Sequence, residues 1–427
     1  MNRWGIFALA VLIAAAAWAF VVCTAKPPTA ALKPPDAAKP AAPAAGKPTR
    51  PVKRTSGIPT ALASVTTPTI EPERPSVEVV FVLDTTGSMG DLIQAAKAKI
   101  WAIANTLVSA KPTPRIKMGL VAYRDRGDEY VTRHTDLTGD LDAVYKDLLG
   151  FQAAAGGDEP ESVNQALHEA VTQLSWSRDS STYRVIFLVG DSPPHMDYAD
   201  DVKYPETCRL AAAAGIVINT IQCGTNTTTP GIWSDIALPS EGRYFRVEQS
   251  GGAILATTPY DGKLAALGTE LAATRVYYGS AKERADLGRS FEMDAAIDAK
   301  APTSARASRA GFMAEFSADA LGPRQELLDD VTGGRVKLTD LKKDSLPESM
   351  QAMTPAEREA FVAQLQAKRA KLQAEIKDLS AKRQAAIDEE VRKRADKGKT
   401  SLDYMVYDTI KAQAAKKGIE YTDGPAH

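Results

Sequence analysis

The chain has 427 residues, of which 44% are hydrophobic and 25% charged, a composition typical of a globular protein with a real core. Its length suits one large domain and a smaller one. The formal net charge of −1 provides no bulk attraction to polyanions, so the sequence predicts no nucleic-acid partner.

The composition of the N-terminal end favours export. Residues 5–23 are almost wholly apolar and follow Arg3, so we interpret residues 1–25 as a cleaved signal peptide or an inner-membrane anchor. We therefore expect a periplasmic or cell-envelope protein. The lysines that follow the apolar run argue for the opposite orientation, because positive charge tends to stay cytoplasmic. Residues 26–75 are rich in proline and alanine and predict a disordered linker. If the N-terminal segment is an uncleaved anchor, it tethers the chain to the membrane through this linker.

A buried strand is predicted at residues 77–83, which are mostly apolar and β-branched. It ends in Asp84-x-Thr86-x-Ser88, and a helical apolar pattern then begins. In an open α/β sheet, ligands bind beyond the carboxyl ends of strands. Three oxygen-bearing side chains there suit a hard divalent cation, Mg²⁺ first, with Ca²⁺ or Mn²⁺ as alternatives. The competing interpretation is that these residues only cap the helix.

Strands and helices then alternate along the chain. Strands are predicted at 117–124, 130–135, 184–190, 215–223 and 243–247. Helices are predicted at 141–149, 232–238 and 264–273, and a further helix begins at the loop 156–163 and runs to residue 174. The two strands at 117–135 read as a hairpin. This order predicts an α/β fold with a doubly wound, mostly parallel sheet. Acids that follow strands or open helices, at 84, 158–161 and 191, should converge at one edge of the sheet.

The layout resembles a von Willebrand factor type A domain (VWA domain) with its metal-ion-dependent adhesion site, over residues 76–280. The resemblance rests on Asp84-x-Thr86-x-Ser88, on the glycine-rich loop at 156–162 and on Asp191 after an apolar strand. It implies six strands in the order 3-2-1-4-5-6 and one divalent cation, usually Mg²⁺, that binds an acidic group of a partner. The residues of these motifs are similar to those in the VWA domains of atypical alpha-type kinases, but no kinase sequence motifs follow.

The resemblance implies that Asp84, Thr86, Ser88 and Asp191 are metal ligands. In the second loop the family has a threonine, and this chain has an acid instead. Counting from the glycines gives Asp158, and counting back from the following helix gives Glu161. Either acid should hold the ion more tightly and weaken attraction for an acidic partner.

The sequence has three cysteines, of which Cys208 is predicted on a helix and Cys223 at the end of a strand. Exported proteins often oxidise such pairs. The predicted offset along the two elements exceeds what a disulfide spans, so buried free thiols are favoured.

The C-terminal third is predicted to be helical. Residues 281–345 read as a mixed helical connector, and 346–427 as a helical region whose long helix runs from 354 to about 397. Leu365, Leu372 and Leu379 recur every seven residues. The favoured interpretation is a helical hairpin with residues 401–417. A coiled coil that forms homo-oligomers or binds a partner is the alternative.

Three functions are compatible with these features. The favoured one is a non-enzymatic, tethered adhesion or scaffold module that binds a protein through its metal. The second is a metal-assisted hydrolase that uses the same ion, with His195 or Glu161 as base. The third is a structural envelope protein that oligomerises through its helices. The identity of the protein partner cannot be read from the sequence.

Overall fold

The computed structural model describes residues 74–157, 159–316, 325–393, 400–422 and 424. These belong to one compact unit, Thr69–His427. The predicted signal or anchor at 1–25, and the predicted tether up to residue 73, lie outside the described residues. Within the described ranges, no helix is both long and apolar enough to cross a membrane.

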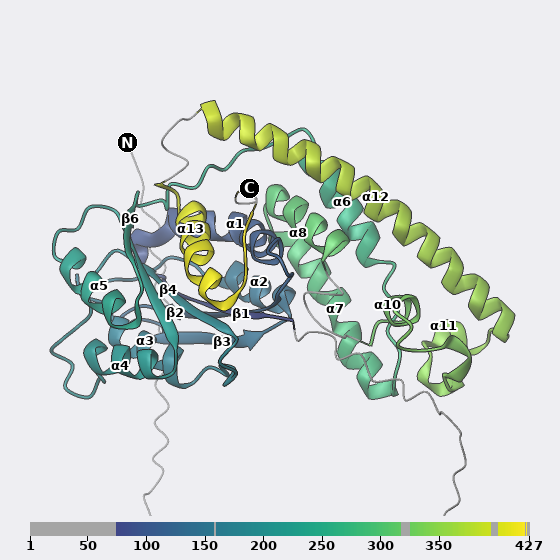
Figure 1. Ribbon diagram of the computed structural model, residues 1–427, viewed down its shortest axis with the longest axis horizontal. Coiled ribbons are helices and arrows are strands. Elements are labelled where there is room, and N and C mark those ends of the chain that lie inside the picture. The colour runs from purple at the N-terminus through teal and green to yellow at the C-terminus, as the bar shows by residue number, and fades with distance from the viewer. Residues whose placement is uncertain (1–73, 158, 317–324, 394–399, 423, 425–427) are drawn as a thin grey trace, which may run out of the picture. The chain divides into compact units, whose positions relative to one another are not determined.

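A six-stranded sheet forms the centre of the molecule, in the order β3-β2-β1-β4-β5-β6 (Figure 1). The strands are β1 (Ser76–Asp84), β2 (Arg115–Tyr123), β3 (Thr132–Thr138), β4 (Tyr183–Gly190), β5 (Ile216–Cys223) and β6 (Tyr244–Val247). All pairs are parallel except β2–β3, the predicted hairpin at the edge. The predicted α/β fold and strand order are confirmed.

Helices cover both faces of the sheet, and the central strands are accordingly buried along almost their whole length. Alternate residues of β1 enter two separate cores: Val79 and Phe81 face one, and Val80 and Val82 face the other. The first core is covered by α1 (Gly90–Val108), α2 (Leu141–Gly150) and α13 (Leu402–Ala414). The second is covered by α3 (Val163–Thr172), α4 (Tyr204–Ala213) and α5 (Thr229–Ala237).

The remaining helices follow the sheet in the chain. They are α6 (Asp261–Ala272), α7 (Ala281–Lys300), α8 (Thr303–Glu315), α10 (Leu327–Thr332), α11 (Glu348–Gln351) and α12 (Pro355–Lys393). The long helix α12 begins at the predicted place, where Thr354 and Glu357 form reciprocal capping hydrogen bonds. Its apolar residues Leu372 and Ile376 pack with α6 and α8.

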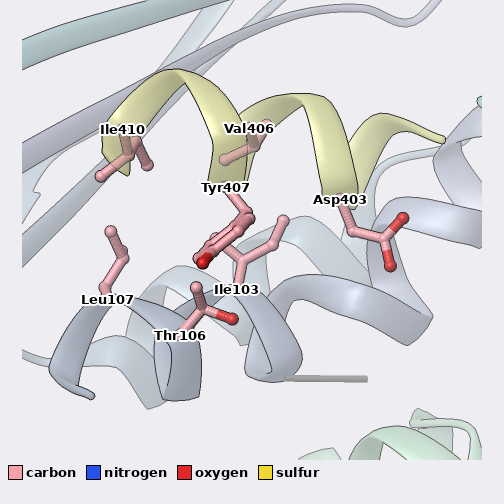
Figure 2. Close-up of a pocket in the computed structure, with 7 residues that line it drawn as sticks. All are labelled: Ile103, Thr106, Leu107, Asp403, Val406, Tyr407 and Ile410. Atoms are coloured by element: carbon pink, nitrogen blue, oxygen red, sulfur yellow. The ribbon is translucent and has the colours of Figure 1, made fainter. Parts of the chain in front are cut away.

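The predicted helical hairpin is wrong. Helix α13 does not return along α12 but enters the core on the first face of the sheet, with Val406, Tyr407 and Ile410 buried there. Figure 2 shows these three side chains directed toward α1, around a cavity of about 10 Å³. A cavity of that size admits about one water, so the interface is closely packed. The C-terminal segment therefore completes the sheet domain rather than the helical region.

The two described cysteines are free thiols, as favoured from the sequence. Cys208 on α4 and Cys223 at the end of β5 are both fully buried. The thiol of Cys208 donates to the Ile236 carbonyl oxygen at 3.3 Å. They belong to different cores on opposite faces of the sheet, which explains why no disulfide joins them.

Candidate metal centre

The first loop brings Asp84, Thr86 and Ser88 together at the carboxyl end of β1. The Thr86 hydroxyl and main-chain N–H both donate to Asp84 Oδ1, at 2.6 and 2.8 Å, and the Thr86 and Ser88 hydroxyl oxygens are 3.5 Å apart. Neither the short helix Gly87–Met89 nor α1 has a capping side-chain hydrogen bond at its start. The three side chains therefore do not serve as helix caps.

The second loop is held against the first by main-chain hydrogen bonds. The Ala154 N–H donates to the Thr85 carbonyl and the Gly87 N–H to the Ala155 carbonyl, both at 3.2 Å. Gly156 has a φ of +86°, and a Cβ there would lie 3.2 Å from Thr86 Cβ. A glycine therefore lets the second loop approach the Thr86 side chain closely.

Of the two acids proposed for the second loop, Glu161 lies at the site. Its side chain is buried, with Oε1 3.6 Å from the position of a Cβ on Gly156. Its main chain is fixed to the third loop, because its N–H donates to the Pro193 carbonyl at 2.9 Å. Asp158 lies outside the described residues.

The third loop contributes Asp191, which directly follows β4. Its carboxylate is half-buried and interacts electrostatically with both Asp84 and Glu161. The preceding residue must be glycine, since a Cβ on Gly190 would lie 2.4 Å from the Tyr123 hydroxyl and 3.1 Å from Asp84 Oδ2. The chain therefore makes room at this point for a tyrosine hydroxyl and a carboxylate.

Three buried oxygens at this edge have no hydrogen-bond partner among the described residues: Asp84 Oδ2, Glu161 Oε2 and the Tyr123 hydroxyl. Burial raises the pKa of Asp84 to about 7, although its hydrogen bonds with Thr86 oppose the shift. Burial and then the charge of Asp84 raise the pKa of Glu161 to about 9. Burial and the neighbouring carboxylates hold the pKa of Tyr123 well above its usual range. Among the described residues, no basic side chain donates to these three oxygens.

The donor set fits a hard cation. Carboxylate and hydroxyl oxygens are the ligands that Mg²⁺ and Ca²⁺ prefer, and uncompensated buried carboxylates are what a cation would neutralise. Within the described ranges no group of three or more histidine, cysteine, aspartate or glutamate side chains has the geometry of a metal cluster. Asp84, Glu161 and Asp191 therefore do not form such a cluster by themselves, and the hydroxyls of Thr86 and Ser88 belong to the candidate ligand set as well.

His195 lies behind the site and is buried. Its Nδ1 is 2.8 Å from Asp197 and its Nε2 is 3.4 Å from Asp125, and its ring stacks on Tyr198 with centroids 4.1 Å apart. Asp125 also accepts from the hydroxyls of Ser162 and Tyr198, both at 2.8 Å. These contacts give His195 a role in fixing the loops rather than in reaching a ligand.

Sequence reasoning missed Tyr123 and Gln249. Gln249 follows β6, and its Nε2 donates to Asp191 Oδ2 at 2.8 Å. The strand periodicity places Tyr123 at the end of β2, next to Asp84 in the register. That position alone could have marked Tyr123 as a neighbour of the site.

The fold and the site together define a doubly wound α/β domain with an oxygen-rich centre at the carboxyl edge of its sheet. Residues 78–258 match the family model of the von Willebrand factor A domain, and this part of the chain is a VWA domain. The predicted VWA domain is confirmed, over residues 78–258 rather than 76–280.

The relatives match a minor part of the chain. The human von Willebrand factor A domain-containing protein 7 is 38% identical over 123 residues, and the rat protein 37% over 120 residues. Each match covers 28% of this chain and spans 12% of the relative's own length. Among solved structures, BatB from Bacteroides thetaiotaomicron is 19% identical with a TM-score of 0.32, over 40% of this chain and 90% of that chain.

Proposed function

We propose that the VWA domain is a protein-binding module that engages its partner through a divalent cation, Mg²⁺ first, held by Asp84, Thr86, Ser88, Glu161 and Asp191. The fold is consistent with a protein-binding role in adhesion or scaffolding. The main support for a bound metal is that three buried oxygens without hydrogen-bond partners among the described residues converge at the carboxyl edge of the sheet.

Bound there, a divalent cation would supply positive charge and an open coordination position for an oxygen of the partner. The residues of the chain prepare this site in two ways. Asp84 and Glu161 each place a buried carboxylate oxygen without a hydrogen-bond partner among the described residues, and Thr86 orients Asp84 through two hydrogen bonds. Ser88 is exposed, so the rim of the site is open to a protein surface.

The non-enzymatic role is part of the proposal. A metal-assisted hydrolase needs a base directed at its substrate, and the two ring nitrogens of His195 face Asp197 and Asp125 instead. Glu161, the other candidate base, is buried beside Asp84. We assign it to the metal.

Metal binding is tested by titrating Mg²⁺, Ca²⁺ and Mn²⁺ into the full chain by calorimetry. We expect Asp84→Asn and Glu161→Gln each to weaken binding at least tenfold, with Asp378→Asn on the exposed side of α12 as the matched control. Equal affinities in all four proteins would refute the site. Asp158→Asn should behave like the control if Glu161 is the ligand.

Partner binding is tested by capture from cell-envelope extract, with Mg²⁺ or with EDTA. We expect proteins that are retained by the wild type in Mg²⁺ and lost in EDTA and in Asp84→Ala. Identical sets of captured proteins in all conditions would defeat the metal-dependent role.

Export and tethering complete the proposal, with residues 1–25 as signal peptide or anchor and 26–75 as tether. Fractionation of cells that express the full chain distinguishes the alternatives. A protein shortened at its N-terminus in the periplasm indicates cleavage, and a full-length protein in the membrane fraction indicates an anchor. Recovery of the full-length protein in the cytosol would contradict both.

A further inference from the structure

The loop that follows β6 reaches across the carboxyl edge of the sheet to the candidate metal centre. At its tip, Gln249 Nε2 lies 2.8 Å from Asp191 Oδ2 and 3.3 Å from the main-chain oxygen of Ser88, and it donates to both. One amide group therefore joins the first and third loops, which lie far apart in the sequence. The other oxygen of Asp191 accepts from the Ser192 hydroxyl at 3.0 Å.

Gly224, at the end of the neighbouring strand β5, leaves room for the side-chain amide of Gln249. Gly224 has a φ of +75°, and a Cβ there would lie 2.1 Å from Gln249 Oε1. Any other residue at position 224 would push the amide away and would strain the backbone. The Gly224 N–H also donates to the Val247 carbonyl at 3.0 Å, which fixes the two strand ends to each other.

The part of this loop that follows Gln249 contacts α1 and the start of α13. Gly251 has a φ of +78°, and a Cβ there would lie 2.7 Å from Leu92 Cδ1 on α1. Its carbonyl accepts from the Leu402 N–H, at the start of α13, at 2.8 Å. The loop that carries Gln249 is therefore held on both sides, so the amide is presented to Asp191 from a fixed support.

We infer that Gln249 is a positioning residue of the candidate metal centre, which orients Asp191 toward the ion and ties the third loop to the first. This inference rests on the proposed metal site. An amide that donates to one carboxylate oxygen limits rotation of the carboxylate. Residues that hydrogen-bond to a metal ligand in this way commonly change metal affinity by about ten- to a hundredfold. Because Gln249 is exposed, we expect an effect at the lower end of that range.

Two variants remove the interaction by different routes. Gln249→Met keeps the length of the side chain without a donor, and Gly224→Ala displaces the amide while Gln249 itself stays intact. Glu248→Gln, at an exposed position of the same loop, is the control. We expect the first two variants to weaken Mg²⁺ binding by about tenfold in calorimetry and the control to match the wild type.

Hydrogen exchange in EDTA gives a readout that does not depend on the ion. We expect the amides of residues 86–90, Asp191 and Ser192 to exchange faster in Gln249→Met and Gly224→Ala than in the wild type and the control. Unchanged Mg²⁺ affinity in Gln249→Met overturns the inference. If the wild type binds no cation, the proposed metal function fails, and exchange alone decides: faster exchange supports positioning of Asp191 by Gln249, and unchanged exchange overturns it.

Discussion

The sheet-bearing part of the molecule and its helical part are held together by different interactions. Around the sheet, two large apolar cores contain most of the buried apolar side chains, and the first extends to Ile297, Ala305 and Phe312 of the helical part. In the helical part the apolar clusters are smaller, and buried arginines pair with acids from other helices. Apolar patterns can be recognised within one stretch of sequence, but an ion pair depends on two distant residues. This difference determines which part of the fold can be predicted.

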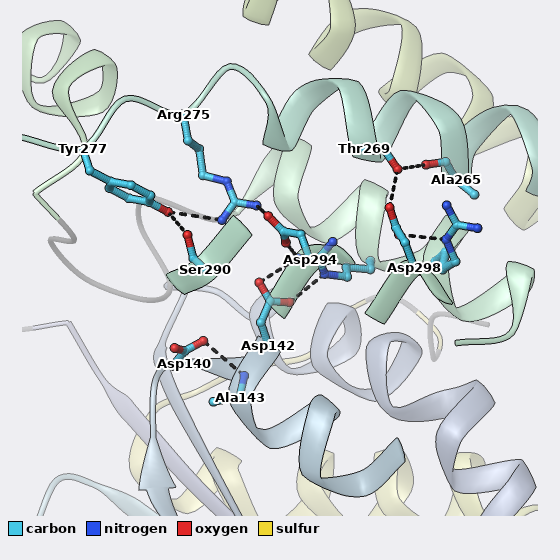
Figure 3. Close-up of polar contacts among 12 residues, drawn as sticks. Asp140, Asp142, Ala143, Ala265, Thr269, Arg275, Tyr277, Ser290, Asp294 and Asp298 are labelled. Carbon is cyan, nitrogen blue, oxygen red and sulfur yellow. Dashed lines mark hydrogen bonds and ion pairs between the residues drawn. The ribbon is translucent and has the colours of Figure 1, made fainter. Parts of the chain in front are cut away.

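Arg309 on α8 is the clearest case of such a buried ion pair. Its guanidinium donates to both oxygens of Asp142 on α2, at 2.6 and 2.8 Å, and also to Asp294 on α7. Asp294 in turn accepts from Arg275 at 2.7 Å, as the contacts at Asp142 and Asp294 in Figure 3 show. This network fastens the helical part to the sheet-bearing part.

The largest predicted effect is the loss of this connection. Arg309→Ala should lower the free energy of unfolding by about 3–5 kcal/mol, because Asp142 loses both of its hydrogen bonds from Arg309 and Asp294 keeps only the one from Arg275. Urea unfolding followed by circular dichroism measures the change. Lys382→Ala removes an exposed pair with Asp378 on α12 and should change stability by less than about 1 kcal/mol. A loss below that value for Arg309→Ala would show that the helical part does not depend on the network.

A second substitution tests the assignment of α13 to the sheet core. Ile410→Ala should cost about 2–4 kcal/mol, since Ile410 is buried in the first core and its removal leaves a cavity. Lys416→Ala, which removes an exposed pair with Glu241, is the control near the same helix. Faster hydrogen exchange in α1 for Ile410→Ala alone would confirm that α13 covers that helix, and exchange confined to α12 would contradict it.

The strands, and the sheet edge at which the candidate site is proposed, could be predicted because each depends on a local pattern, whereas the strand order was implied by the resemblance to VWA domains. An apolar β-branched run followed by Asp84 and Thr86 specifies both a strand and the edge at which it ends. The position of α13 could not be predicted, because its apolar face fits α12 as well as the sheet by pattern alone. The pairing of Arg369 on α12 with Glu326 likewise depends on a residue 43 positions away. The role of Gln249 at the site was missed, because the position of its amide depends on Gly224 on the neighbouring strand.

The metal-free protein should lose stability as pH rises. Asp84 and Glu161 have pKa values raised by burial to about 7 and about 9 in the folded state, so the folded state binds more protons than the unfolded state from about pH 4 upward. Stability then falls with rising pH by at most about 1.4 kcal/mol per pH unit for each proton, until both groups are ionised. Denaturant unfolding in EDTA between pH 5 and 9 measures the slope.

Glu161→Gln gives the control for this pH dependence. The amide stays neutral, so the slope between pH 7 and 9 should flatten, and added Mg²⁺ should stabilise the wild type more at pH 8 than at pH 6. A wild-type slope that Glu161→Gln leaves unchanged would mean that other groups bind the protons.

The smallest expected change is in thiol reactivity, and it separates the two parts of the molecule. Cys208 and Cys223 lie in the two sheet cores. Burial raises the pKa of Cys208 to about 12 and holds the pKa of Cys223 well above its usual range, so both thiols should resist a thiol reagent in the native protein. Because Cys223 shares its core with α13, Ile410→Ala should speed its labelling several-fold, as opening of that core becomes more frequent. Arg309→Ala loosens the helical part and should leave Cys208, on the opposite face, protected at low urea. Labelling followed by mass spectrometry assigns each thiol. If both thiols react together in Arg309→Ala at low urea, the helical part and the sheet unfold as one cooperative unit. The two parts then differ in the interactions that stabilise them but not in the way they unfold.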